Sequence, residues 1–144
     1  MTEPAKKRPE FRNINAFDDL PGYRWPAASI ASGMHRISGL AMFLLMPFII
    51  WLFDKSVSSE ISFAKFRSTF NNGLWIFPAF FIKLVVLALI WAYLHHFIAG
   101  LRHLRMDVSH AAVTKQSGAT SAKATLAISI VLTVLLGAKL FGLY

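Results

Sequence analysis

Three long apolar runs limit the folds open to this chain more than any other feature of its sequence. They extend over residues 29–53, 75–105 and 121–143. Each is long enough to cross a bilayer as a helix, which takes about 20 residues, whereas a barrel strand takes only about 9 to 11 and alternates in polarity. Because the runs are apolar on all sides, the sequence predicts an all-α integral membrane protein with three transmembrane helices.

The rest of the composition agrees with a membrane setting. Of the 144 residues, 56% are hydrophobic and 15% are charged, and the mean hydropathy of +0.52 is above that of ordinary soluble domains. Residues 1–28 are polar and contain several turn formers, so we expect a surface arm, ordered by a partner, ahead of a transmembrane domain over residues 29–144. The chain has no cysteine, which excludes disulfides and iron–sulfur ligation by this chain alone.

The distribution of lysine and arginine predicts the orientation in the membrane. Ten of these residues lie in the arm, at the start of the first run or between the second and third runs, and five lie elsewhere. Because cytoplasmic loops carry the excess of positive charge, we expect a cytoplasmic N-terminus and a periplasmic C-terminus. No presequence rich in arginine and serine is evident, which favours a bacterial inner membrane over a mitochondrial one. The net charge of +8 reflects this bias, and no basic stripe with interleaved aromatic residues indicates nucleic acid.

Histidines near the end of the second run indicate a cofactor. Polar ionisable groups are expensive in lipid and usually functional there. A neutral imidazole ligates iron well, and Gly100, one helical turn after His96, leaves room beside it for a flat macrocycle. His95 is an alternative ligand, but it has no glycine four residues later and is expected at an interface or surface. We therefore expect haem with His96 as an axial ligand, while the plainer interpretation of His96 is a polar contact between helices.

A second polar cluster stands at the start of the first run. Ser32, His35 and Arg36 are spaced three and four residues apart, so they share one face if the segment is helical. They are expected at the same membrane depth as His103. A hydroxyl, an imidazole and a guanidinium suit either a haem propionate or a quinone carbonyl. The plainer interpretations are a serine bonded to its own helix and an arginine that reaches to lipid phosphates.

The two clusters have compatible positions along the second run. His103 follows His96 by seven residues, about 10 Å along a helix. Propionates of a haem bound at His96 would therefore point toward His103 and Arg36. Asp107 lies one further turn out, near the interface, where it is a candidate proton relay or a partner for a basic neighbour.

Both clusters match the motifs of a known family. Ser-x-x-His-Arg-x-Ser over residues 32–38, and His-x-x-x-Gly-x-Arg-His-x-x-x-Asp over residues 96–107, together with Arg8-Pro9, resemble the cytochrome b556 membrane-anchor subunits of succinate dehydrogenase, respiratory complex II. The resemblance covers nearly the whole chain. Two positions depart from the usual pattern, Glu10 after the Arg-Pro pair and Ser109 after Asp107.

The resemblance implies a place in a larger enzyme. In that family a flavoprotein oxidises succinate, an iron–sulfur protein carries the electrons, and two small membrane subunits hold one haem b and reduce ubiquinone. It implies that His96 is one axial haem ligand, that the partner anchor subunit supplies the other, and that the two anchors complete one helical bundle. It also implies that Ser32 and Arg36 belong to the quinone site, and that His35, Arg36 and His103 lie near the propionates.

Two alternatives remain open on sequence grounds. The chain is a structural anchor without haem, or it is the haem b subunit of another quinone-linked dehydrogenase such as a fumarate reductase or a hydrogenase. The latter class often carries both axial histidines in one chain, and we expect His35 to lie too near the inner end of its helix to face His96 at equal depth. Succinate oxidation by this chain itself is excluded, because it has no dinucleotide-binding fingerprint and little material outside the membrane.

Overall fold

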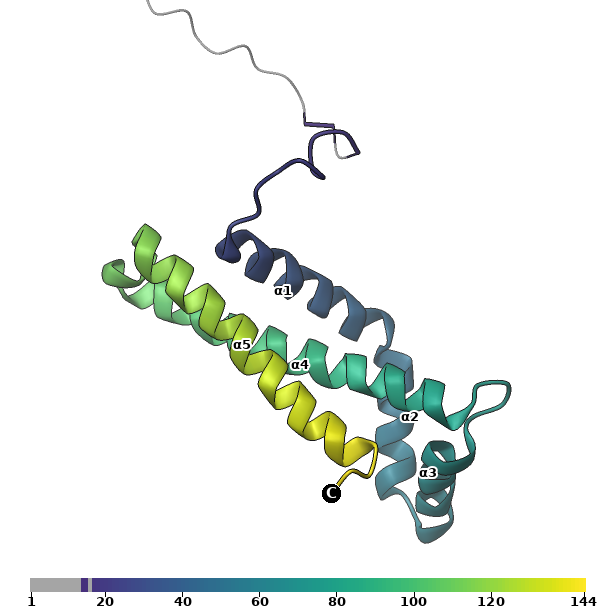
Figure 1. Cartoon of the computed structure of the whole chain (residues 1–144). Helices are drawn as coiled ribbons and strands as arrows, with labels where there is room; N and C mark the ends of the chain where they lie inside the picture. The colour runs from purple at the N-terminus through teal and green to yellow at the C-terminus, as the bar shows by residue number, and fades with distance from the viewer. Residues whose placement is uncertain (1–13, 16) are drawn as a thin grey trace, which may run out of the picture.

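A computed structural model of the chain describes residues 14–15 and 17–144, so the Arg8-Pro9 pair and Glu10 lie outside the described residues. Its elements are α1 (Ala27–Leu44), α2 (Met46–Val57), α3 (Glu60–Asn72), α4 (Ala79–Val108), the short 3-10 helix η1 (His110–Val113) and α5 (Lys115–Leu140) (Figure 1). Within these residues the only extended pairing is an isolated bridge between Leu74 and Phe77. The all-helical prediction is confirmed.

The spans agree in number with the expectation when the first is counted as a bent pair. Helices α4 and α5 are each long and apolar enough to cross a membrane, and α1 and α2 qualify together. The first apolar run is thus two helices, which meet at Leu45 with a bend of 59°. Pro47 explains the break, because it has no amide hydrogen to donate to the preceding turn and its ring crowds the carbonyl four residues earlier. In the first turn of α2 the same proline is unstrained.

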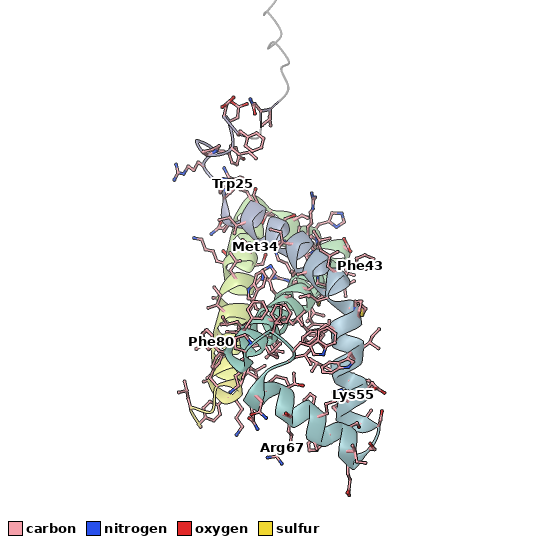
Figure 2. All side chains as sticks on the ribbon, turned by 90° about the vertical axis from the view of Figure 1, so that its right-hand side faces the viewer. Trp25, Met34, Phe43, Lys55, Arg67 and Phe80 are labelled. Atoms are coloured by element: carbon pink, nitrogen blue, oxygen red, sulfur yellow. The ribbon has the colours of Figure 1, made fainter. Side chains whose placement is uncertain are left out.

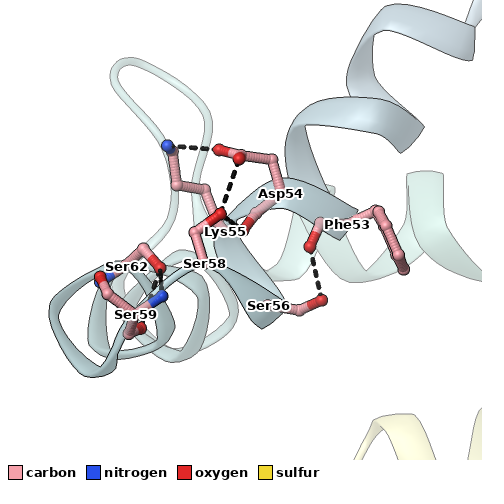
Figure 3. A network of polar contacts seen from close by, with 7 residues as sticks. All are labelled: Phe53, Asp54, Lys55, Ser56, Ser58, Ser59 and Ser62. Atoms are coloured by element: carbon pink, nitrogen blue, oxygen red, sulfur yellow. Dashed lines mark hydrogen bonds and ion pairs between the residues drawn. The ribbon is translucent and has the colours of Figure 1, made fainter.

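Helix α3 was not predicted from the hydropathy pattern, and a polar corner begins it (Figure 3). Ser59 caps the helix by accepting a hydrogen bond from the Ser62 amide at 3.1 Å, and the Ser62 hydroxyl accepts one from the Ser59 amide at 2.9 Å. This reciprocal capping box satisfies two amides that a helix start otherwise leaves without partners. The ion pair between Lys55 and Asp54, at 2.6 Å, is part of the same corner. Because these groups are exposed, they fix the local path of the chain and add little stability.

A tight turn between α3 and α4 explains why α4 begins at Ala79 and not at residue 75. Leu74 and Phe77 exchange two backbone hydrogen bonds of 2.9 Å. Gly73 has φ +94°, and a Cβ there would lie 2.3 Å from the Phe77 carbonyl oxygen. Only glycine fits both restrictions.

Helix α4 is the centre of the fold, with α1 and α5 packed against it (Figure 1). The buried apolar side chains along these contacts are mostly alanines, namely Ala31, Ala92, Ala99 and Ala122. Small residues let helices approach closely where lipid removes the hydrophobic drive for association. Most large apolar side chains remain exposed on the outer faces of the helices, as expected of a chain surrounded by lipid or by another membrane subunit.

Trp25 and Arg67 mark the two ends of the helical bundle (Figure 2). We call the end that carries Trp25, the end of α4 and the start of α5 the Trp25 end, and the opposite end the Arg67 end. At the Arg67 end, Lys83 lies over the Phe141 ring at 5.8 Å and Lys139 over the Tyr144 ring at 5.4 Å. The two lysines in otherwise apolar helices therefore make cation–π contacts with aromatic rings.

Candidate functional site

Helices α1 and α4 bring the two predicted polar clusters together near the Trp25 end. The His35 ring lies between two rings of α4, with centroid distances of 4.2 Å to His96 and 5.3 Å to His103. His35 is thus level with His96, contrary to the expectation that it lies too near the end of its helix. The two rings are in direct contact, which leaves no space for an iron and a macrocycle between them. His35 and His96 therefore do not face each other across a haem as two axial ligands, and the reason is this contact and not a difference in depth.

His96 is held in one orientation by α1. Its Nδ1 lies 3.1 Å from the His35 carbonyl oxygen and 3.2 Å from the hydroxyl of Ser38, which itself donates to the same carbonyl at 2.8 Å. Because a carbonyl oxygen only accepts, a neutral His96 ring carries its proton on Nδ1. Nε2 therefore keeps its lone pair, the form in which an imidazole binds a metal.

Two glycines set the space around this imidazole. A Cβ on Gly39 would lie 3.0 Å from His96 Cε1, so the absence of a side chain there lets the ring seat against α1. Around Gly100, a Cβ would meet nothing within 4 Å. The surface one turn beyond His96 is accordingly open.

His95 has a different role from the one expected, because it is fully buried and not at an interface or surface. Its exposed fraction is 0%, its Nδ1 lies 3.2 Å from the Ser129 hydroxyl, and its Nε2 lies 3.3 Å from the Ala31 carbonyl oxygen. Trp91 stacks on it with a centroid distance of 5.5 Å. Both ring nitrogens face polar groups of neighbouring helices, so His95 joins α1, α4 and α5 and is enclosed by the protein, away from a metal.

Replacement of His95 by alanine is expected to destabilise the assembled, detergent-solubilised protein by about 1 to 2 kcal/mol, because it removes two interhelical hydrogen bonds and leaves their partners buried. The measurement is the thermal unfolding midpoint. His110→Ala is the control, since His110 is exposed, and it is expected to leave the midpoint unchanged. An unchanged midpoint for His95→Ala would contradict the structural role.

His35 has a buried nitrogen without a partner. Among the described residues, its Nε2 is the one buried side-chain nitrogen or oxygen that makes no hydrogen bond. A buried polar atom without a partner is costly and in native structures normally has one. The atom next to His96 and His103 therefore indicates a group from outside the chain, such as an acceptor oxygen.

Ser32 and Arg36 line an open cavity at the start of α1. Its volume is about 410 Å³, and its walls are Trp25, Ala28, Ser29, Ser32, Gly33 and Arg36. The Ser32 hydroxyl makes no hydrogen bond to a described residue, whereas Ser38, Ser121 and Ser129 donate to the carbonyl three residues earlier in their helices. The plainer interpretation of Ser32, a bond to its own helix, is thus not what the structure has. The cavity offers a free hydroxyl beside an exposed guanidinium.

The remaining polar residues of the α4 motif divide into a structural one and an isolated one. Arg102 donates from Nε to the Ser121 hydroxyl at 3.1 Å and from Nη2 to the Gly118 carbonyl at 3.3 Å. It therefore joins α4 to α5. Asp107 is exposed and, within the described part of the chain, makes neither an ion pair nor a hydrogen bond. A basic partner for Asp107 is not present there.

The residues around His96 fit a haem. No group of three or more histidine, aspartate or glutamate side chains converges on a common point among the described residues, so a bare metal ion has no cage. In a haem, the porphyrin supplies the equatorial ligands of the iron, and the protein supplies only axial ligands. His96 offers one such nitrogen, Gly100 leaves open space, and the unpartnered His35 Nε2 suits a propionate oxygen.

Sequence reasoning gave no role in the site to three residues. Ser38 orients His96, and Ser29 and Trp25 line the cavity with Ser32. A signal for Ser29 was present, because it precedes Ser32 by three residues and so shares its helix face.

The chain matches a family of membrane subunits. The family model described as the succinate dehydrogenase/fumarate reductase transmembrane subunit matches residues 7–136. Among curated relatives, the succinate dehydrogenase cytochrome b556 subunit of Coxiella burnetii is 34% identical over 119 residues, 83% of this chain and 90% of the relative. The subunit of the same name from Paracoccus denitrificans is 33% identical over 116 residues, 81% of this chain and 83% of the relative. A succinate dehydrogenase cytochrome b560 subunit from Porphyra purpurea is 33% identical over 85 residues, 59% and 64%.

Proposed function

This chain belongs to the succinate dehydrogenase/fumarate reductase transmembrane subunit family, and we propose that within a succinate dehydrogenase it holds haem b and forms part of the site where ubiquinone is reduced. As a multi-pass membrane subunit of an enzyme complex, it has no succinate chemistry of its own. Its proposed partners are a flavoprotein, an iron–sulfur subunit and a second small membrane anchor. The unburied apolar faces of its helices support a second anchor that completes the bundle within the lipid.

His96 is the proposed axial ligand from this chain, and the second axial ligand comes from the partner anchor. What supports this assignment is the bond from His96 Nδ1 to the His35 carbonyl, which leaves Nε2 as the donor nitrogen. When bound, haem b supplies a one-electron carrier between the iron–sulfur centres and the quinone. His35, Arg36 and His103 hold the propionates, where imidazole and guanidinium donors meet carboxylate oxygens.

Ser32 and Arg36 are the proposed quinone-binding residues of this chain. Reduction places negative charge on a carbonyl oxygen, and the guanidinium and hydroxyl in one cavity are donors that stabilise this charge as it develops. Arg36 provides a fixed positive charge, since a guanidinium does not lose its proton at physiological pH. The cavity at the Trp25 end is the observation that carries the quinone assignment.

The proposed orientation places the Trp25 end in the cytoplasm and the C-terminus in the periplasm. Ten of the 15 lysines and arginines belong to the arm or to that end (Lys6, Lys7, Arg8, Arg12, Arg24, Arg36, Arg102, Arg105, Lys115 and Lys123), against five elsewhere, and this excess of positive charge favours the cytoplasmic side. Protons for the quinone then enter from the cytoplasmic surface, and Asp107, exposed near it, is a proposed relay. Residues 1–28 form the proposed cytoplasmic arm, and a bacterial inner membrane is the proposed location.

Ser32→Ala tests the quinone site with a small change. The loss of one neutral hydrogen bond is expected to lower kcat/KM for quinone reduction by succinate about tenfold. Succinate oxidation by an artificial dye that accepts electrons from the soluble subunits is expected to stay at the wild-type rate. Ser56→Ala, at the Arg67 end, is the matched control and is expected to match wild type in both assays. Loss of both activities in Ser32→Ala would show failed assembly, and wild-type quinone reduction would contradict the assignment.

A further inference from the structure

Ser29 occupies the first turn of α1 and lines the same cavity as Ser32 and Arg36. Nothing in the two sequence motifs assigns it a role. Like the Ser32 hydroxyl, its hydroxyl makes no hydrogen bond to a described residue, although its backbone amide donates to the Pro26 carbonyl at 2.9 Å.

A comparison with α3 explains why the Ser29 hydroxyl is free. Ser29 is the third residue of α1, as Ser62 is of α3, and Ser62 accepts a hydrogen bond from the amide of its N-cap residue Ser59 at 2.9 Å. The N-cap residue of α1 is Pro26, which has no amide hydrogen. The Ser62 hydroxyl also donates to the Ser59 carbonyl at 2.9 Å, whereas the counterpart carbonyl in α1, that of Pro26, already accepts from the amides of Ser29 at 2.9 Å and Ile30 at 3.1 Å. The Ser29 hydroxyl bonds to neither local group and is left to the cavity.

The three polar residues of the cavity form one row along α1. Ser29, Ser32 and Arg36 follow a spacing of three and then four residues, which keeps them on one face. Ser29 is about 4.5 Å from Ser32 along the helix axis, at 1.5 Å of rise per residue. That separation is within the span of a quinone ring and its substituents, so a ring whose carbonyl meets Ser32 and Arg36 can present a neighbouring oxygen to Ser29.

We propose that Ser29 is a specificity-determining residue that donates a hydrogen bond to an alkoxy oxygen on the quinone ring, and so selects alkoxy-substituted benzoquinones. The inference rests on the quinone site proposed above and deepens it. An alkoxy oxygen accepts a hydrogen bond, whereas a methyl group at the same ring position leaves the Ser29 hydroxyl without a partner in the occupied cavity. The residue acts on binding, because the alkoxy oxygen takes up neither the electrons nor the protons of the reaction.

The test uses the intact complex and two short-chain quinones that differ only in carrying two methoxy or two methyl groups on the ring. Rates are normalised to the succinate–dye rate of each preparation, so that incomplete assembly does not count as a binding effect. In Ser29→Ala, KM for the dimethoxy quinone is expected to rise about five- to tenfold, as for one lost hydrogen bond, with kcat changed less than about twofold. KM for the dimethyl quinone is expected not to rise, because the variant also removes the hydroxyl that this substrate leaves without a partner. Ser29→Thr keeps a hydroxyl and is expected to keep the wild-type preference.

The outcomes separate this inference from the function on which it rests. If KM in Ser29→Ala rises for both quinones, or for neither, the proposed selectivity is wrong. The proposed quinone site is still supported in that case if Ser32→Ala lowers the reduction of both quinones. If Ser32→Ala and Arg36→Ala both reduce each quinone at the wild-type rate, the proposed quinone site is contradicted, and so is the role of Ser29 that rests on it. A loss of preference in Ser29→Thr equal to that in Ser29→Ala also contradicts a role for the hydroxyl.

Discussion

The reduced-minus-oxidised spectrum of the assembled complex is expected to lose its b-type band when His96 is replaced by alanine. Nε2 of His96 is the proposed ligand nitrogen, because Nδ1 is bonded to the His35 carbonyl and both nitrogens of the adjacent His95 face polar groups inside the bundle. Loss of an axial ligand leaves the iron without its bond to this chain. The measurement is a dithionite-reduced minus oxidised spectrum of the purified complex, with haem content per flavin as a second readout.

His95→Leu is the matched control for this experiment. It removes the adjacent imidazole and is expected to lower stability while the band persists. An unchanged band in His96→Ala with the subunits still associated would assign the ligand to His103 or to another chain. The absence of a band in both wild type and variant would instead favour a structural anchor without haem.

Quinone reduction is expected to fall about 100-fold in Arg36→Ala, a larger effect than in Ser32→Ala. The guanidinium is the charged donor of the cavity, and loss of a donor aimed at developing negative charge typically costs a factor of 10² to 10³ in rate. Arg36→Lys is expected to recover only part of the loss, since an ammonium keeps the charge but not the planar fork of donors. Steady-state quinone reduction by succinate, normalised to the dye rate, measures both variants.

Arg105→Ala provides the control for removing positive charge at the Trp25 end. Arg105 is exposed on α4 and lies outside the cavity lined by Ser32, so its loss is expected to leave quinone reduction unchanged. Equal losses in Arg36→Ala and Arg105→Ala would indicate a general electrostatic effect and contradict a specific contact. A wild-type rate in Arg36→Ala would contradict the quinone site.

Hydropathy and spacing predicted the helical class and the number of spans, because an apolar run longer than a bilayer is thick leaves few other solutions. They did not predict the break at Leu45, although Pro47 was visible, since a proline in a membrane helix produces anything from a slight kink to a new helix according to what packs around it. Helix α3 was missed because its mixed polarity has no long apolar face, and its start depends on the local bonds of Ser59 and Ser62.

The sequence predicted which residues make up the candidate site. It did not predict which of their nitrogen atoms and hydroxyl groups lack a hydrogen-bond partner. Spacing placed His35 at the depth of His103, but it did not predict the contact between His35 and His96. The assignment of His95 to the core depended on Ser129 in α5 and the Ala31 carbonyl in α1, partners that are distant in sequence. In the same way, the free hydroxyl of Ser32 follows from the path of α1 beside a cavity, which no local pattern encodes.

Because His96 packs directly against Gly39, substitutions at these two positions depend on each other. A methyl group at position 39 would lie 3.0 Å from the imidazole, so a larger residue there fits the helix contact better when position 96 is smaller. A smaller residue at position 96 gives up the nitrogen proposed as the axial ligand. The pair is therefore epistatic: the background in which position 39 accepts a larger residue is one that has lost the proposed iron ligand.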